Sequence, residues 1–119
     1  MGKKIIIIDD DADLSAQMVE VLRDEGHQVC RRLYTHENLP DFKPDDYDVI
    51  VLDFKMPDLS GIDILKSISK KDFKAKIFIV TGRPFIEKIL NEENLLCMVS
   101  EIINKPFSIR NLLDKINNS

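Results

Sequence analysis

The chain has 119 residues, enough for one domain with a single core, and 44% of them are hydrophobic, as in ordinary globular proteins. Its 17 basic and 21 acidic residues give a net charge of −4, which excludes a strongly basic nucleic-acid-binding surface. No apolar run is long enough to span a membrane, and Cys30 and Cys97 lack metal-type spacing. We therefore expect one cytoplasmic domain over residues 1–119, with reduced thiols, no bound nucleic acid and no membrane segment.

Hydrophobic runs predict five strands, two of which are fully apolar. The runs Ile5–Ile8 and Val49–Leu52 are mostly β-branched and resemble strands buried on both faces, as at the centre of a parallel sheet. A weaker strand, expected nearer an edge, lies between them in sequence at 27–33. The remaining two strands are expected at 76–80 and within 97–104.

Helical spacing of apolar residues fills the intervals between these strands. The first helix is expected to stop at Gly26, and the last is expected to be capped by Ser108. Between the second and third strands, Thr35 is a possible cap for a short helix that Pro40 and Pro44 limit. The apolar helix faces are Leu14, Met18, Val21 and Leu22; Ile62, Ile64, Leu65 and Ile68, ending near Lys71; Phe85, Ile86, Ile89 and Leu90; and Ile109, Leu112, Leu113 and Ile116. Alternation of strands and helices predicts an α/β fold, with a parallel sheet, right-handed crossovers and helices on both faces.

Polar residues end four of these strands, and parallel strands place their carboxyl ends at one edge. Strand one ends in Asp9-Asp10, strand three in Asp53, strand four in Thr81 and strand five in Lys105. Carboxylates brought together repel one another, and a divalent cation with oxygen ligands, typically Mg²⁺ when phosphates are handled, removes that cost. A hydroxyl and an ammonium opposite them suit the oxygens of a transferring phosphoryl group, with Asp53 as nucleophile.

Each of these groups also has a purely structural explanation. The acids after strand one fit a helix N-terminus, the preferred explanation for Asp11 and Asp13. Thr81-Gly82 fits a turn, and Lys105 fits a solvated residue before a proline. The coincidence of suitable groups at all these strand ends favours a site.

The motifs together resemble the receiver domain of two-component response regulators over essentially the whole chain. They are the acidic pair Asp9-Asp10, the D-x-x-M-P-x-x-x-G run from Asp53 to Gly61, Thr81-Gly82, and Lys105-Pro106-Phe107. The resemblance implies a doubly wound, five-stranded parallel sheet in the flavodoxin-like order 2-1-3-4-5. It also implies a signalling phosphoprotein that catalyses only its own phosphorylation and dephosphorylation and relays the signal by a conformational change.

The resemblance further assigns roles to individual residues. Asp53 resembles the phosphoacceptor, Thr81 the hydroxyl that holds the phosphoryl group, and Lys105 its ion-pair partner. The implied Mg²⁺ ligands are Asp10 directly, Asp9 mainly through water, Asp53, and the backbone carbonyl of Lys55. In similar proteins the Lys105-Pro106 bond is cis. The implied phosphodonor is a phosphohistidine on a sensor histidine kinase or a histidine phosphotransfer protein, and the downstream target is not implied.

Three departures from the family pattern concern the surfaces through which phosphorylation would be recognised by other proteins. Pro40 and Pro44 predict a short or irregular second helix. The spacing from Thr81 to Lys105 is slightly long, and Asn94-Leu95-Leu96-Cys97 replaces the customary Gly-Ala, which leaves the helix between strands four and five undefined in length. Ile102 stands where similar proteins have Tyr or Phe.

Three alternatives remain to be weighed. A haloacid-dehalogenase-like phosphatase would use Asp9 as nucleophile and Asp11 as general acid, but it leaves the Asp53–Pro57 run unexplained and lacks an acidic pair after Lys105. An EF-hand loop starting at Asp9 would need glycine where Leu14 stands, and a helix where the four isoleucines predict a strand. A receiver with a purely structural role is disfavoured by the intact acidic, hydroxyl and lysine set.

Overall fold

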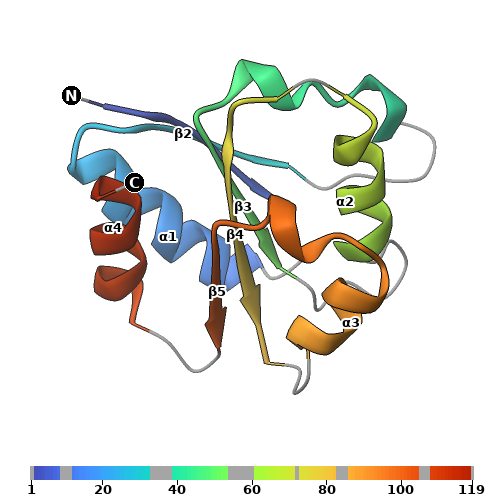
Figure 1. Cartoon of the computed structure of the whole chain (residues 1–119). Helices are drawn as coiled ribbons and strands as arrows, with labels where there is room; N and C mark the ends of the chain where they lie inside the picture. Colours follow the sequence, from blue (N-terminus) through green and yellow to red (C-terminus); the bar gives the residue numbers. More distant parts are fainter. Residues whose placement is uncertain are drawn as a thin grey trace.

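The computed structural model describes residues 2–8, 12–32, 39–53, 61–71, 73–82, 86–104 and 108–118, in which strands alternate with helices (Figure 1). The strands are β1 (Lys4–Ile8), β2 (Gln28–Arg32), β3 (Val49–Asp53), β4 (Lys76–Thr81) and β5 (Glu101–Asn104). The helices are α1 (Ala12–Asp24), α2 (Gly61–Ser69), α3 (Ile86–Glu92) and α4 (Ile109–Asn117). Short 3₁₀ turns lie at Leu39–Asp41, Pro44–Asp46 and Leu96–Met98. No helix in these ranges is long and apolar enough to cross a bilayer.

The strands form one parallel sheet in the order β2-β1-β3-β4-β5, which confirms the predicted fold class and topology. The two fully apolar runs are adjacent at its interior, where Ile5–Ile8 pair in register with Val49–Leu52. All eight of these residues are at most 1% exposed, since helices cover both faces of the sheet. β2 is an edge strand, as its weaker pattern predicted.

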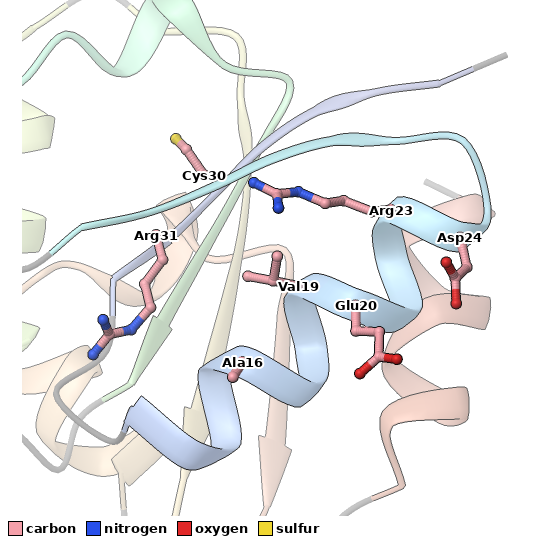
Figure 2. Close-up of a pocket in the computed structure, with 7 residues that line it drawn as sticks. All are labelled: Ala16, Val19, Glu20, Arg23, Asp24, Cys30 and Arg31. Atoms are coloured by element: carbon pink, nitrogen blue, oxygen red, sulfur yellow. The ribbon is translucent and has the colours of Figure 1, made fainter.

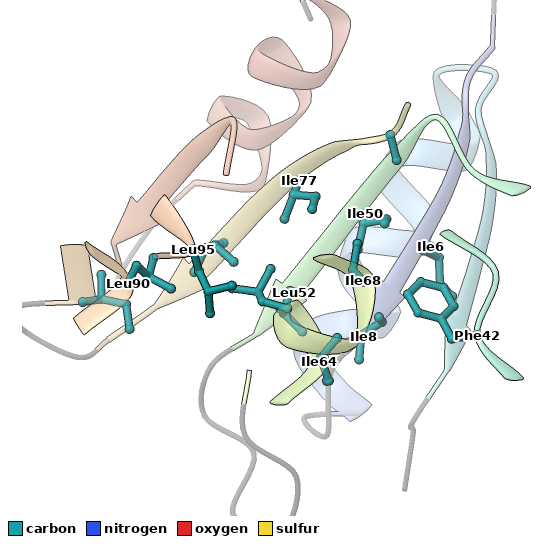
Figure 3. Packing of buried hydrophobic residues seen from close by; sticks show 14 residues of the cluster. Ile6, Ile8, Phe42, Ile50, Leu52, Ile64, Ile68, Ile77, Leu90 and Leu95 are labelled. Atoms are coloured by element: carbon teal, nitrogen blue, oxygen red, sulfur yellow. The ribbon is translucent and has the colours of Figure 1, made fainter. Parts of the chain in front are cut away.

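Alternating side chains along the strands supply two separate cores, one on each face of the sheet. On one face, Ile5, Ile7 and Phe78 pack with buried residues of α1 and α4. On the other face, strand residues such as Ile50 and Leu52 pack with residues of α2 and α3 (Figure 3). Figure 1 shows the two helix pairs on opposite sides of the sheet. The prediction of helices on both faces is confirmed.

The two prolines determine the conformation of the described part of the segment between β2 and β3. Pro40 and Pro44 each lie in a 3₁₀ turn, and no α-helix occurs between residues 39 and 48. The predicted irregularity is therefore confirmed for this part, whereas Thr35 lies outside the described residues. Phe42, 2% exposed, inserts its ring into the core on the α2/α3 side (Figure 3). The ammonium of Lys71, after α2, donates to the carbonyls of Pro40 (3.0 Å) and Phe42 and so fixes these turns from outside.

The last helix begins as its sequence predicted. The hydroxyl of Ser108 accepts a hydrogen bond from the backbone N–H of Asn111 at 3.3 Å, which satisfies one of the free donors of the first turn. Leu112, Leu113 and Ile116 are buried on the α1 side of the sheet. The helix therefore has a defined start close to the carboxyl ends of the strands.

A polar cluster at the opposite edge of the sheet holds the end of α4. The Lys3 ammonium donates to the Ile116 carbonyl at 2.7 Å, and the Lys3 backbone N–H donates to Nδ1 of His27 at 3.0 Å. Because Nδ1 accepts, the ring proton of neutral His27 lies on Nε2, which donates to Oδ1 of Asn117 at 2.9 Å. His27 is only 7% exposed, so the start of β1, the turn before β2 and the end of α4 are joined through one buried ring.

Helices α1 and α3 end in the same backbone motif. Gly26 follows α1 with φ of +91°, as expected for the predicted stop, and Asn94 follows α3 with φ of +59°. After α3, the Leu95 N–H donates to the Leu90 carbonyl at 2.8 Å, and the Asn94 N–H donates to the Asn91 carbonyl at 3.1 Å. This pair of bonds is a Schellman motif, in which asparagine takes the left-handed position usually given to glycine.

The end of α3 is also tied to α2. The Lys66 ammonium lies 2.9 Å from the carboxylate of Glu93, and this hydrogen bond raises the pKa of Lys66 above its ordinary value. Both side chains are about half exposed, so the pair orients the turn more than it stabilises the fold. Helix α3 therefore has a fixed end in spite of its short length.

Asn94→Ala is expected to lower the free energy of unfolding by about 1 kcal/mol. The conformational energy of a positive φ is higher for alanine than for asparagine, and alanine has no side-chain amide to offset it. Asn94→Gly is expected to retain or slightly raise stability. Urea unfolding of the three proteins measures both effects. Asn91→Ala, at an exposed helical position one turn earlier, is the control and should not destabilise; equal losses for Asn91→Ala and Asn94→Ala would contradict the backbone explanation.

Candidate functional site

Two predicted site residues lie at the carboxyl ends of adjacent strands. Asp53 is the last residue of β3 and is 2% exposed, and Thr81 is the last residue of β4 and is 1% exposed. Asp53 pairs in register with Val80, so Thr81 lies one residue further along the neighbouring strand. The structure therefore brings the predicted nucleophile and hydroxyl to the same place on the sheet edge.

The two side chains start from opposite faces of the sheet. Val80, the register partner of Asp53, packs in the core on the α1/α4 side, whereas Ile79 packs on the α2/α3 side. Side chains alternate along a strand and register partners in a parallel sheet share a face, so Asp53 starts from the α1/α4 face and Thr81 from the α2/α3 face. A group bound beyond the strand ends is thereby approached from both faces.

A buried carboxylate is costly without compensation. Both Asp53 and Thr81 interact with other groups, so neither is an orphaned polar residue. The surrounding strand residues are apolar, and Leu52, next to Asp53 on β3, is fully buried. Asp53 is thus a largely dehydrated oxygen donor at the end of an otherwise hydrophobic strand.

The remaining predicted site residues lie outside the described part of the chain: Asp9, Asp10, Lys55 and Lys105. The strands that precede them do reach the same edge, since Ile8 pairs with Leu52 and Asn104 pairs with Thr81. Among the described residues, no three His, Cys, Asp or Glu side chains form a group able to hold a metal ion. Three of the four predicted Mg²⁺ ligands fall outside that search, so the metal site stays a prediction.

The region around Ile102 is hollowed. Ile102 is half-buried against the core on the α2/α3 side, next to a pocket of about 290 Å³ formed by α3, the 3₁₀ turn after it, and β5. The lining residues are Glu87, Leu96, Val99, Ser100, Glu101 and Ile102. β5 lies within the predicted segment 97–104 and occupies its second half, because a 3₁₀ turn at Leu96–Met98 takes up the first part.

A second groove lies between α1 and β2, away from the strand-end site (Figure 2). Its volume is about 710 Å³, and its charged lining residues are Glu20, Arg23, Asp24 and Arg31. The Arg23 guanidinium also donates to the Val29 carbonyl at 2.8 Å, so this side chain helps to hold β2 on α1. The groove contains none of the predicted site residues.

Comparison with known proteins identifies the family. Residues 5–117 match the model of the response regulator receiver domain. The chain is 26% identical to the chemotaxis protein CheY of Thermotoga maritima, over 98% of this chain and 97% of that protein. It is 28% identical to sporulation initiation phosphotransferase F of Bacillus subtilis, over 98% and 92%. With the transcriptional regulatory protein SpaR of Bacillus subtilis it shares 32% identity but spans only 50% of that protein.

Solved structures agree with this assignment. The receiver domain of Francisella response regulator 1452 superposes with a TM-score of 0.81 at 27% identity, covering 98% of this chain and 95% of that one. The chain therefore belongs to the response regulator receiver domain family and has its five-stranded parallel fold. Neither the sheet order nor these matches support the phosphatase alternative with Asp9 as nucleophile.

Proposed function

We propose that residues 1–119 form a single receiver domain in which Asp53 accepts a phosphoryl group from a phosphohistidine. The observation that carries this proposal is the position of Asp53: a buried carboxylate at the end of an interior strand, one residue out of register with Thr81, in a member of the receiver family. The donor is a sensor histidine kinase or a histidine phosphotransfer protein. The proposed setting is the cytoplasm.

The chemistry is a displacement at phosphorus. An oxygen of Asp53 attacks the phosphorus in line with the phosphohistidine nitrogen, the P–N bond breaks, and an acyl phosphate forms. Burial of Asp53 contributes because it excludes water and strengthens electrostatic interactions around the reacting carboxylate. The only turnover expected is loss of this phosphoryl group to water.

A divalent cation fits the set of donors proposed here. Asp9, Asp10, Asp53 and the Lys55 carbonyl supply oxygen ligands, which Mg²⁺ prefers. Bound there, Mg²⁺ would neutralise charge on the phosphoryl oxygens and on the clustered carboxylates. Thr81 donates its hydroxyl proton to a phosphoryl oxygen from the other face of the sheet, and Lys105 pairs with the phosphoryl charge.

The first test is labelling of Asp53. With Mg²⁺ and acetyl phosphate, intact-mass measurement is expected to show one added phosphoryl group that hydroxylamine removes. Asp53→Asn should show none, chelation should abolish labelling, and Asp10→Asn should weaken Mg²⁺ binding. Asp9→Asn serves as the comparison: labelling that survives Asp53→Asn but not Asp9→Asn would establish the phosphatase chemistry instead.

A second test concerns the lifetime of the acyl phosphate. Lys55 and Arg83 lie two residues beyond Asp53 and Thr81, and long cationic side chains there would screen the phosphorus from in-line water. Replacing both with alanine is expected to speed loss of the phosphoryl group by about threefold or more. The double variant of the exposed Lys70 and Lys74 removes the same charge away from the site. Equal decay rates in all three proteins would rule out screening.

A third test follows the conformational response. In Ile102 there is no ring to sweep through the adjacent pocket, and β-branching restricts χ1. Beryllofluoride, a phosphoryl mimic, is therefore expected to shift amide resonances strongly from Thr81 to about Ile89, and less near Ile102 and along α4. Two-dimensional NMR of the labelled protein measures this pattern. Equally large shifts throughout α4 would show that the surface is remodelled without an aromatic residue at position 102.

A further inference from the structure

Asn104 is the residue of β5 that lies directly beside Thr81. The two are register partners in the parallel β4–β5 pair, and both end their strands. Ile102, two residues earlier, packs in the core on the α2/α3 side, and Ile103 packs on the opposite side. By alternation Asn104 starts from the α2/α3 face, which is also the face of Thr81.

The environments of these two neighbours differ sharply. Thr81 is 1% exposed, whereas Asn104 is exposed, because β5 is an edge strand and no further strand pairs with it. Neighbouring strands are about 4.8 Å apart, so an asparagine amide and a threonine hydroxyl in register on one face are within reach of each other. The Asn104 side chain makes no hydrogen bond within the described ranges, so its amide donors are available.

The hydroxyl of Thr81 has one donor and two acceptor positions. When its proton points to a phosphoryl oxygen, its lone pairs are positions at which it can accept a hydrogen bond from a donor. The side-chain N–H of Asn104 is a donor on the correct face.

We propose that Asn104 is a positioning residue for Thr81. In the phosphorylated protein its amide donates to Oγ1 of Thr81, and Thr81 donates to a phosphoryl oxygen. Each bond in such a chain polarises the next, so the outer amide strengthens the inner contact and selects the Thr81 rotamer that makes it. This inference rests on the proposed phosphorylation of Asp53, and it couples the edge strand β5 to the phosphoryl group without an aromatic residue.

The test is a double-mutant cycle read by beryllofluoride affinity in Mg²⁺, measured by NMR titration. Asn104→Ala is expected to weaken binding about three- to tenfold, the range of one net hydrogen bond. In the Thr81→Val background, which removes the hydroxyl but keeps the shape, the same substitution should change affinity less than twofold. Asn118→Ala, at the exposed position that follows α4, is the control and should leave affinity unchanged.

The outcomes test the role of Asn104 separately from the proposed phosphorylation of Asp53. An unaltered affinity in Asn104→Ala, or an equal loss with and without the Thr81 hydroxyl, overturns the positioning role. Mass labelling of Asp53 in the unmodified protein is measured in parallel: if it occurs and the cycle shows no coupling, only the inference about Asn104 fails. If labelling does not occur, the proposed function fails and the inference fails with it. Unfolding midpoints in urea identify any loss caused by destabilisation.

Discussion

The pairing of β1 with β3 is the constraint on which the rest of the molecule depends. Each strand is a run of apolar residues that requires cover on both faces, and the interior of a parallel sheet provides it. Once these strands are adjacent and parallel, the acid that ends β3 must emerge at an edge shared with the other strand ends. The position of the candidate site is therefore a consequence of how the core is buried, and Asp53, the proposed nucleophile, is held by a strand that cannot shift register without exposing apolar side chains.

Much of the fold and part of the site could be predicted from the sequence because they depend on local patterns. The apolar runs, Gly26 and Ser108 identified strands and helix ends correctly, and Asp53 and Thr81 were found as residues that end strands. Element ends were less exact: α2 stops at Ser69, before the predicted Lys71. The position of Asn104 beside Thr81 was not predicted, because it depends on the register of two strands joined through α3, which no local pattern specifies. The hydrogen bonds of the His27 ring were not predicted for the same reason, since its partners are distant in sequence.

The two edges of the sheet differ in how firmly they hold α4. At the amino edge, Lys3 and His27 fix the last turn of the helix through hydrogen bonds that are partly buried. At the carboxyl edge, the helix begins at Ser108, a few residues after β5 ends beside Thr81. A change at the strand ends on the proposed phosphorylation would therefore act on α4 at one end while the other is held, which favours a small pivot of the helix over a translation.

Helix α3 is constrained in the opposite sense. Its far end is fixed by the left-handed turn at Asn94 and by the pair between Lys66 and Glu93, whereas its first residue, Ile86, follows Thr81 closely in sequence. A displacement of Thr81 on the proposed phosphorylation would therefore reach α3 at its first turn, while the turn at the other end is fixed. Glu87, in the first turn of α3, lines the pocket beside Ile102, and none of the lining residues has an aromatic ring. Within this surface, the proposed route to the edge strand is the register pair of Thr81 and Asn104, and the proposed route to α3 is the chain that joins it to β4.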